Sequence, residues 1–545
     1  MTRAACPFLW PLKTVRQLPI LCALLAAHTL LVTCTVAVAA PSADVARCAA
    51  LAGTELDQSK VLHAEWQAPL FIATWDASVD REIVPVAFCR IEGEASAGPG
   101  SDIRFEVWLP SRKAWNGRLL GLGASGSLGS INRPDLGVGV TRGFASVATD
   151  NGHRGYAIRE SDWALGHPER VEDFGYRAHH LATVAAKELT GKFYGERQHY
   201  SYFLGCSQGG TKGMMAAQRF PADYDGIVAG APVYSWANEM TFQAWGFRAL
   251  TATAGTALSR EQMQALYAAT AKQCAGPDGL IGDPRECHFD PAVLQCPQAS
   301  GECLSAAQVT AVRKLYQGPI TTSGISILRG LTPGGESSWA SLWDLADADP
   351  TRSGSWFGVY RFMVFENPKW DPASLDFDRD PALAKRKIGP LLDPDSPDLS
   401  AFRARGGKLL VYHGWGDQMV PAQTSTDYHA AVVAKMGGRR KVDGFFRLFM
   451  IPGMAHCVGG PGASELLHLT DVSAVPAEPG RDVLVTMQRW VEMHSVPQEL
   501  VTTRSDESGH VEQTRLVCSE PRQARYLGSG NPRDASRWRC RGERR

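Results

Sequence analysis

The chain has 545 residues. This length exceeds what a single hydrophobic core can organise, because single cores stop growing at roughly 250–300 residues. Lysine plus arginine number 56, as do aspartate plus glutamate, so the zero formal net charge provides no global field for nucleic acid or an anionic membrane. Hydrophobic residues make up 44% of the chain, with 54 glycines and 33 prolines, which excludes a coiled coil or a disordered chain. We expect two domains, or one with a large insertion, and a small molecule rather than nucleic acid as the partner.

The N-terminal segment, residues 1–40, has the features of a signal peptide. Three basic residues precede an uncharged stretch, 18–40, that ends in the small-residue run Ala-Val-Ala-Ala. The stretch is also long enough for a retained anchor, and segment 31–34 resembles a lipoprotein box with threonine before its cysteine. Because the small residues fit a peptidase site better, we expect cleavage and a secreted or periplasmic protein without stable membrane insertion. No later segment reaches transmembrane length.

Export changes how the cysteines are interpreted. Three of the 13 fall in the predicted signal peptide, and the others are Cys48, Cys89, Cys206, Cys274, Cys287, Cys296, Cys303, Cys457, Cys518 and Cys540. An even number in an oxidising compartment indicates five disulfides. The four cysteines between positions 274 and 303 are a candidate zinc site, but their spacings of 13, 9 and 7 differ from the close pairs of zinc modules. Local disulfides are favoured.

Residues 41–235 alternate between short apolar runs and Gly-rich turns. Four runs predict strands, at 103–109, 118–123, 144–149 and 200–205, and 176–189 has the pattern of a helix between them. Such alternation is typical of a parallel or mixed sheet covered by helices. We interpret 41–235 as the first part of an α/β core.

The block 236–400 differs in composition, with many Trp, Pro and Asp residues, four cysteines and little strand pattern. We interpret it as an inserted lid domain. Strand-like runs return at 408–412 and 445–451, and a helix-like run follows at 481–493. Residues 401–545 are therefore expected to form the second part of the same core.

The segment from Gly205 to Gly209 reads Gly-Cys-Ser-Gln-Gly, a G-x-S-x-G motif between a predicted strand and a run of helical composition, 211–220. The nucleophile elbow needs this arrangement, because only small flanking residues fit around a serine on a strained strand-to-helix turn. The helix N-terminus also directs its dipole at a developing oxyanion. We predict an α/β-hydrolase fold with Ser207 as nucleophile and the backbone N–H of Gln208 as one oxyanion donor.

In this fold the acid and the base follow the serine along the chain, on loops after later strands. Asp417 follows the predicted strand 408–412 on a tight loop, and His456 follows the predicted strand 445–451. We predict a Ser207–His456–Asp417 triad from this order. The alternative is that Asp417 caps a turn and His456 is an ordinary loop histidine. His413 is a rival base, but it lies only four residues before Asp417 and is interpreted as structural.

Several motifs together resemble the tannase and feruloyl esterase family, which includes bacterial mono(hydroxyethyl) terephthalate hydrolase. They are Cys206-Ser207 at the elbow, the loop 413–417, His456-Cys457, and the segments 115–118, 121–126, 149–153, 223–232 and 283–285. The resemblance spans nearly the whole mature chain. It implies a serine esterase acting on esters of aromatic acids, of feruloyl, galloyl or terephthalate monoester type, and a disulfide between Cys206 and Cys457.

The resemblance also implies site residues beyond the triad. The second oxyanion donor is expected in the glycine loop 121–126, at Gly123 or Ala124. Independently of the resemblance, residues 356–365 of the lid form an aromatic-rich run with one cation, which suits an aromatic acyl group. The residues expected to bind the substrate are Trp356, Arg361, Phe365 and Val420. The alternative is that these lid rings are packing residues, as buried aromatics usually are.

The family carries a calcium site in its lid between two cysteines. Here the corresponding stretch between Cys274 and Cys287 offers Asp278, Asp283 and the carbonyl of Leu280, fewer than the six to eight oxygens that calcium takes. A structural calcium ion and a plain turn closed by a disulfide both remain open. No cofactor is expected for the chemistry itself.

Three other functions remain as alternatives. A serine peptidase is opposed only by the family resemblance, and a lipid esterase by the lack of a long apolar lid segment in the sequence. A non-catalytic hydrolase-fold binding protein has no need of all three triad groups.

Overall fold

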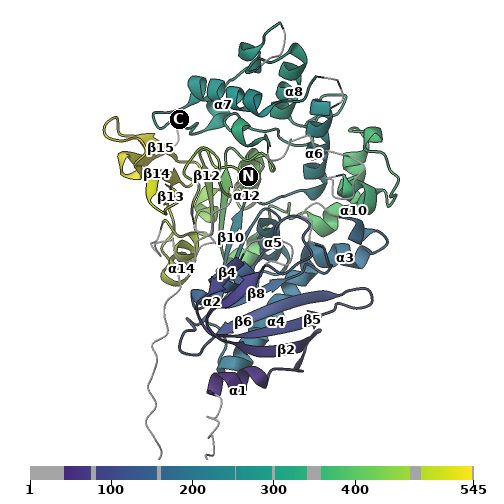
Figure 1. The fold of residues 1–545 in the computed structure, drawn as a ribbon, viewed down its shortest axis with the longest axis vertical. Helices are drawn as coiled ribbons and strands as arrows, with labels where there is room; N and C mark the ends of the chain where they lie inside the picture. Colours follow the sequence, from purple (N-terminus) through teal and green to yellow (C-terminus); the bar gives the residue numbers. More distant parts are fainter. Residues whose placement is uncertain are drawn as a thin grey trace, which may run out of the picture. The chain divides into compact units, whose positions relative to one another are not determined.

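A ten-stranded sheet organises the protein, in the order β1-β2-β5-β6-β8-β7-β9-β10-β11-β12 (Figure 1). The strands are β1 (Glu55–Leu56), β2 (Ser59–Gln67), β5 (Phe88–Ala95), β6 (Ile103–Pro110), β7 (Arg118–Leu122), β8 (Ala145–Thr149), β9 (Tyr200–Cys206), β10 (Gly226–Gly230), β11 (Lys408–Gly414) and β12 (Phe446–Ile451). Neighbours from β1 to β8 are antiparallel, and those from β8 to β12 are parallel. The sheet is therefore mixed, with its parallel half towards β12.

The computed structural model describes residues 42–74, 81–155, 161–251, 253, 255–297, 301–340, 357–466 and 480–542. The predicted signal peptide lies outside these residues. Ser42–Arg545 forms one compact unit, so the division into core and lid at residues 235 and 400 stays a prediction. No helix among the described residues is long and apolar enough to cross a membrane.

Helices cover both faces of the parallel half, as the complete burial of β8, β10 and β12 requires. On one face Phe203 and Ile227 pack with α5 and α12, whereas Leu204 and Val228 face α2 and α14 on the other. Successive strand residues point to opposite faces, which gives this alternation. The covering helices are α2 (Arg133–Thr141), α4 (Ala178–Tyr194), α5 (Gln208–Arg219), α12 (Gln423–Lys435) and α14 (Val483–Met493). The predicted α/β-hydrolase architecture is confirmed.

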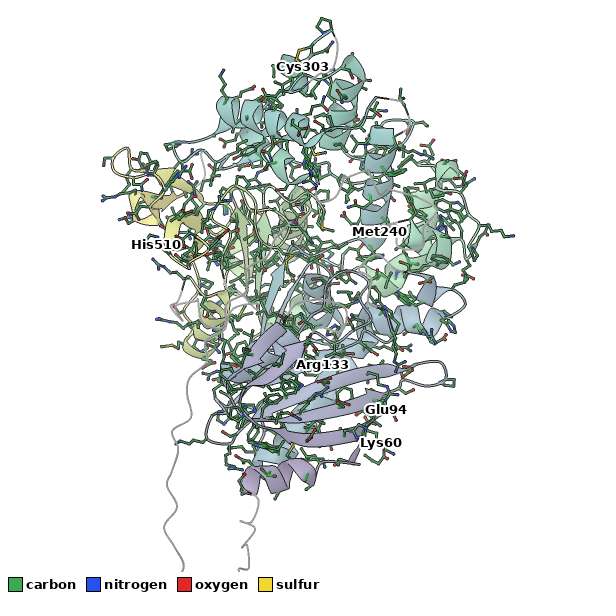
Figure 2. All side chains as sticks on the ribbon, in the orientation of Figure 1. Lys60, Glu94, Arg133, Met240, Cys303 and His510 are labelled. Atoms are coloured by element: carbon green, nitrogen blue, oxygen red, sulfur yellow. A yellow bond between two sulfur atoms is a disulfide. The ribbon has the colours of Figure 1, made fainter. Side chains whose placement is uncertain are left out.

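The first, antiparallel strands carry charged residues on an exposed face. Lys60 of β2 lies opposite Glu94 of β5 in the register, and both side chains are visible at this edge in Figure 2. Antiparallel sheets tolerate one solvated face, so these strands do not form continuous apolar runs.

A largely helical insertion of the chain separates β10 from β11, although these two strands are direct neighbours in the sheet. Its longer helices are α6 (Trp236–Thr251), α7 (Arg260–Cys274), α8 (Ala306–Gln317) and α10 (Asp380–Leu392), with a π-helical turn, η7, at Val359–Val364. Ser259 with Gln262, and Ser305 with Gln308, form capping boxes at the starts of α7 and α8. The side chains of the two glutamines also hydrogen-bond to each other, 2.9 Å from Gln308 Nε2 to Gln262 Oε1, so the two helix starts are fixed together.

The chain ends in two hairpins, β13–β14 (Glu499–Ser505 and Val511–Cys518) and β15–β16 (Gln523–Tyr526 and Trp538–Arg541). A further short hairpin near the N-terminus, β3–β4, joins Phe71–Thr74 to Arg81–Val84. The expectation of five disulfides is confirmed, with Cα–Cα separations between 5.6 and 6.0 Å. The pairs are Cys48–Cys89, Cys206–Cys457, Cys274–Cys287, Cys296–Cys303 and Cys518–Cys540.

Candidate active site

Ser207 stands on the sharp turn between β9 and α5. Its φ of 59° and ψ of −126° are unusual for a residue with a side chain, and its N–H donates to Gly230 O over 2.9 Å. The glycines of the motif are required by space, because a Cβ on Gly205 would lie 2.6 Å from the backbone of Gly209. The predicted elbow is therefore present, and it stores backbone strain under the serine.

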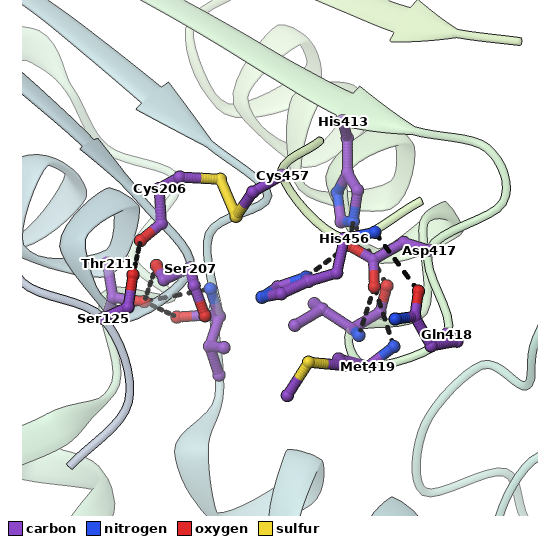
Figure 3. Close-up of a disulfide and its surroundings, with 12 residues drawn as sticks. Ser125, Cys206, Ser207, Thr211, His413, Asp417, Gln418, Met419, His456 and Cys457 are labelled. Atoms are coloured by element: carbon purple, nitrogen blue, oxygen red, sulfur yellow. Dashed lines mark hydrogen bonds and ion pairs between the residues drawn. A yellow bond between two sulfur atoms is a disulfide. The ribbon is translucent and has the colours of Figure 1, made fainter. Parts of the chain in front are cut away.

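His456 and Asp417 are joined by a hydrogen bond of 2.7 Å between Nδ1 and Oδ2. Asp417 follows β11 and His456 follows β12, next to the end of the parallel sheet where Ser207 follows β9. Figure 3 shows the His456 ring lying between Asp417 and Ser207. The three residues predicted as a triad are thus brought to one edge of the sheet, where the carboxyl ends of parallel strands meet.

Asp417 is buried and bound on both carboxylate oxygens. Oδ1 accepts the N–H groups of Met419 and Val420, each over 2.8 Å, and Oδ2 also accepts Nε2 of His413 over 3.1 Å. Burial raises the pKa of the Asp417 carboxyl, but the charge of His456 and hydrogen bonds from both histidines outweigh it, so the pKa lies below its ordinary value. The carboxylate is therefore ionised and fixed in orientation, as a residue that orients an imidazole must be.

The disulfide between Cys206 and Cys457 joins the residue before Ser207 to the residue after His456 (Figure 3). Its Cα atoms lie 6.0 Å apart, and it closes 251 residues of chain that include the whole helical insertion. Cys457 has a φ of 67°, a left-handed conformation in which the chain turns sharply after the histidine. The loop that carries His456 is thereby bonded covalently to the elbow.

The predicted oxyanion loop runs against the elbow. A Cβ on Gly123 would lie 2.6 Å from the Cα of Gly209, and the Ser125 hydroxyl donates to Cys206 O over 3.3 Å. The N–H of Gly123 already donates to Leu204 O over 3.0 Å, extending the ladder between β7 and β9. The N–H of Gly123 is therefore engaged in this ladder, so Ala124 stays the predicted donor of this loop. Gln208, the other predicted donor, is the first residue of α5, three residues before the predicted helical run begins.

Two of the predicted substrate residues lie in one apolar cluster beside the Asp417 loop. Val420 is buried in it and Phe365 packs against it. Arg361 is buried on η7, and Trp356 lies outside the described residues. The Phe365 ring stacks on Trp370 at 5.0 Å, so part of this aromatic run packs on itself as the alternative interpretation expects.

Helix α6 brings two residues to this cluster that the sequence gave no reason to select. Trp236 is one of its buried rings. Glu239, one turn later, is buried and accepts a hydrogen bond from Gln243, whose Nε2 also donates to Met419 O over 2.8 Å. Burial and the nearby charge of Asp417 raise the pKa of the Glu239 carboxyl well above its ordinary value. Glu239 therefore holds its proton more tightly than an ordinary glutamate does, because it is buried near the charge of Asp417.

The residues predicted as calcium ligands do not fit a calcium ion. The Asp278 carboxylate is bound by the guanidinium of Arg515, a buried residue of β14. Asp283 is occupied by Arg285 and by Gln523, and the Leu280 carbonyl accepts the N–H of Gly276 over 2.9 Å. Among the described residues, no group of three or more His, Cys, Asp or Glu side chains is arranged to hold a metal.

Comparison with known proteins shows the family of this chain. A family model described as Tannase and feruloyl esterase matches residues 89–541. An uncharacterised esterase of Xanthomonas campestris pv. campestris is 35% identical, covering 83% of this chain and 84% of that protein. Feruloyl esterase C of Talaromyces stipitatus is 33% identical, covering 84% and 86%.

A solved structure agrees with these relatives. The crystal structure of feruloyl esterase B from Aspergillus oryzae has a TM-score of 0.82 at 32% identity, covering 91% of this chain and 100% of that chain. Since the family model and these relatives match most of the sequence, the chain belongs to the tannase and feruloyl esterase family and is a carboxylic ester hydrolase.

Proposed function

We propose that the protein is an exported serine esterase that hydrolyses esters of aromatic carboxylic acids through an acyl-enzyme on Ser207. The observation that carries this proposal is the 2.7 Å bond between His456 and Asp417, at the same sheet edge as a serine on a strained elbow. These three groups, in these settings, are what nucleophilic acyl transfer requires.

The reaction follows from the roles of the groups. His456, held by Asp417, takes the Ser207 proton as Oγ attacks the ester carbonyl and then gives it to the leaving alcohol. The backbone N–H groups of Gln208 and Ala124 stabilise the oxyanion of each tetrahedral intermediate. His456 then activates the water that releases the acid. No step needs a metal or a cofactor.

An aromatic acyl group is supported by two observations. The relatives include proteins named feruloyl esterase, and the cluster beside the acid loop contains Trp236, Tyr360 and Val420. Ligand sites are mostly apolar with a few placed polar groups, and the buried Arg361, on the same π-helical turn as Tyr360, is a candidate for such a group. Export is supported by the five disulfides, which persist in oxidising compartments.

The decisive experiment compares the wild type with Ser207→Ala on ferulate, gallate, terephthalate monoester and acetate esters, and on a peptide amide. We expect the aromatic esters to be preferred, and the variant to lose about three or more orders of magnitude in kcat. A fluorophosphonate should label the wild type and not the variant. Near-normal activity in Ser207→Ala would contradict the mechanism. Equal rates for acetyl and aromatic esters would contradict the substrate class.

A further inference from the structure

The segment that follows β8, Asp150 to His153, contacts residues 127 and 128, which come directly after the oxyanion loop 121–126, and it has no part in the proposed acyl transfer. Nδ2 of Asn151 donates to Leu128 O over 2.7 Å, and Nε2 of His153 donates to Ser127 O over 2.9 Å. Two successive carbonyls, just after the C-terminal end of the oxyanion loop, are thus held by two side chains of this segment. A pair of backbone hydrogen bonds between Gly129 and Gly155, of 2.9 and 3.2 Å, extends the contact.

Asn151 is fixed at both ends of its side-chain amide. It is fully buried, has a left-handed φ of 61°, and its Oδ1 accepts Nε2 of His179 over 2.9 Å. Burial, with a smaller effect of the Lys212 charge, lowers the pKa of His179 to about 3, so that ring is neutral. Because the Leu128 carbonyl only accepts hydrogen bonds, the amide directs Nδ2 at it, so Oδ1 faces His179 and accepts the proton of its Nε2.

His153 is held with similar precision. Its ring is buried and stacks on Trp163 with the centroids 3.9 Å apart. Burial lowers the pKa of His153 to about 4, so the imidazole is neutral at pH 7. A carbonyl only accepts hydrogen bonds, so the single ring proton is on Nε2, directed at Ser127.

The first residue of the segment, Asp150, is anchored as well. Oδ1 of Asp150 accepts the N–H of Arg104 on β6 over 3.0 Å and that of Gly152 over 2.9 Å. The oxyanion loop is therefore held on one side by Ser125 at the elbow and on the other by this anchored segment.

We infer that Asn151 and His153 are positioning residues for the oxyanion hole, acting through the carbonyls of Leu128 and Ser127 on the Ala124 N–H. The inference rests on the proposed serine esterase mechanism. Oxyanion donors stabilise the transition state only when they are preorganised at the place where charge develops, so a loop free to shift loses part of that effect. The loss falls on the transition state rather than on substrate binding.

The test uses variants that remove a hydrogen bond and keep the local shape. Asn151→Gly accepts the left-handed backbone but lacks the amide, and Gln58→Gly, at an exposed left-handed position with φ 53°, is its matched control. His153→Phe keeps a ring against Trp163 without the donor, whereas His153→Gln restores a donor. Kinetics are expressed per active site, counted by fluorophosphonate titration, so that misfolded protein does not lower the rate.

We expect Asn151→Gly and His153→Phe to lower kcat roughly 10- to 100-fold, with KM within about threefold of wild type, because misplaced catalytic groups cost up to about a hundredfold. A boronic acid analogue of the tetrahedral intermediate should bind more weakly by a similar factor, and His153→Gln should recover part of both losses. Gln58→Gly should match the wild type.

Unchanged kcat in folded Asn151→Gly and His153→Phe overturns the inference, as does a fall in kcat without weaker boronate binding. The Ser207→Ala variant distinguishes failure of this inference from failure of the proposed function. If Ser207→Ala is inactive while the positioning variants are unaffected, the inference fails and the proposed function stands. If Ser207→Ala remains active, the proposed mechanism fails first.

Discussion

Nε2 of His413 lies 3.1 Å from Oδ2 of Asp417, the oxygen that also accepts the hydrogen bond of His456. His413 is fully buried, and its other nitrogen, Nδ1, lies 2.8 Å from the hydroxyl of Ser425 on α12. The ring therefore connects the acid to a helix that covers the sheet. A residue so placed is able to fix the carboxylate without touching the substrate.

Replacing His413 should therefore slow catalysis. We expect His413→Leu to lower kcat about tenfold or more with little change in KM, since Asp417 loses one of its four donors and shifts under His456. His413→Gln, which keeps a donor near the position of Nε2, should retain most of the activity. Circular dichroism and active-site titration show whether each variant is folded. Equal kcat in His413→Leu and wild type would mean that the backbone donors of Met419 and Val420 hold the acid alone.

Most of the parallel half of the sheet was predictable because its strands are buried on both faces and form continuous apolar runs, although β10 was not predicted as a strand. β7, β8, β9 and β12 agree with the predicted runs to within one residue at each end. The antiparallel strands β2 and β5 were not predicted, because polar residues such as Lys60 and Glu94 interrupt them on the exposed face. The final hairpins, β13 to β16, were missed for the same reason.

The catalytic residues of the site were predictable because their order along the chain indicates their roles. Ser207, Asp417 and His456 occupy the settings that their order implied. The choice between Gly123 and Ala124 depends on the register of β7 against β9, which uses the Gly123 N–H, and no local pattern encodes that register. The partner of Asp278 was hidden because Arg515 lies 237 residues away in the chain.

The Cys206–Cys457 disulfide should matter for rate as well as stability. In the chain-entropy model a bond that closes 251 residues stabilises the fold by about 5 kcal/mol. We expect the double variant Cys206→Ala, Cys457→Ala to unfold at lower denaturant concentration and to lose kcat, because the His456 loop is no longer bonded to the elbow. The double variant Cys296→Ala, Cys303→Ala, which opens a disulfide of the insertion, is the control and should keep its kcat. A folded Cys206→Ala, Cys457→Ala variant with wild-type kcat would contradict this role.

Glu239 should make stability depend on pH. Its pKa is raised in the folded protein, so the folded state retains a proton that the unfolded state loses above about pH 4.3. The part of the free energy of unfolding that depends on this carboxyl is therefore largest at low pH and falls as pH rises towards the folded pKa. Glu239→Gln, which is neutral at every pH, should raise the melting temperature at pH 8 more than at pH 4. A difference in melting temperature that stays constant from pH 4 to pH 8 would show that Glu239 is ionised in the folded protein.

Asp278, which the family resemblance suggested as a calcium ligand, forms an ion pair with Arg515. Both side chains are buried, and the Arg515 guanidinium lies 3.6 Å from the centre of the Trp538 ring, so a protein cation joins the loop between Cys274 and Cys287 to the C-terminal hairpins. Removing one partner of a buried pair leaves an uncompensated charge and costs about 3–5 kcal/mol.

We therefore expect Arg515→Met to lower the free energy of unfolding by an amount of that order. The double variant Arg515→Met, Asp278→Asn should recover part of the loss, because it buries no charge. Neither added calcium nor a chelator should shift the melting temperature of the wild type, since a ligand stabilises a protein only by binding its native state. A calcium-dependent rise in the wild type, or a double variant no more stable than Arg515→Met, would show that the carboxylate of Asp278 has another cation as its partner.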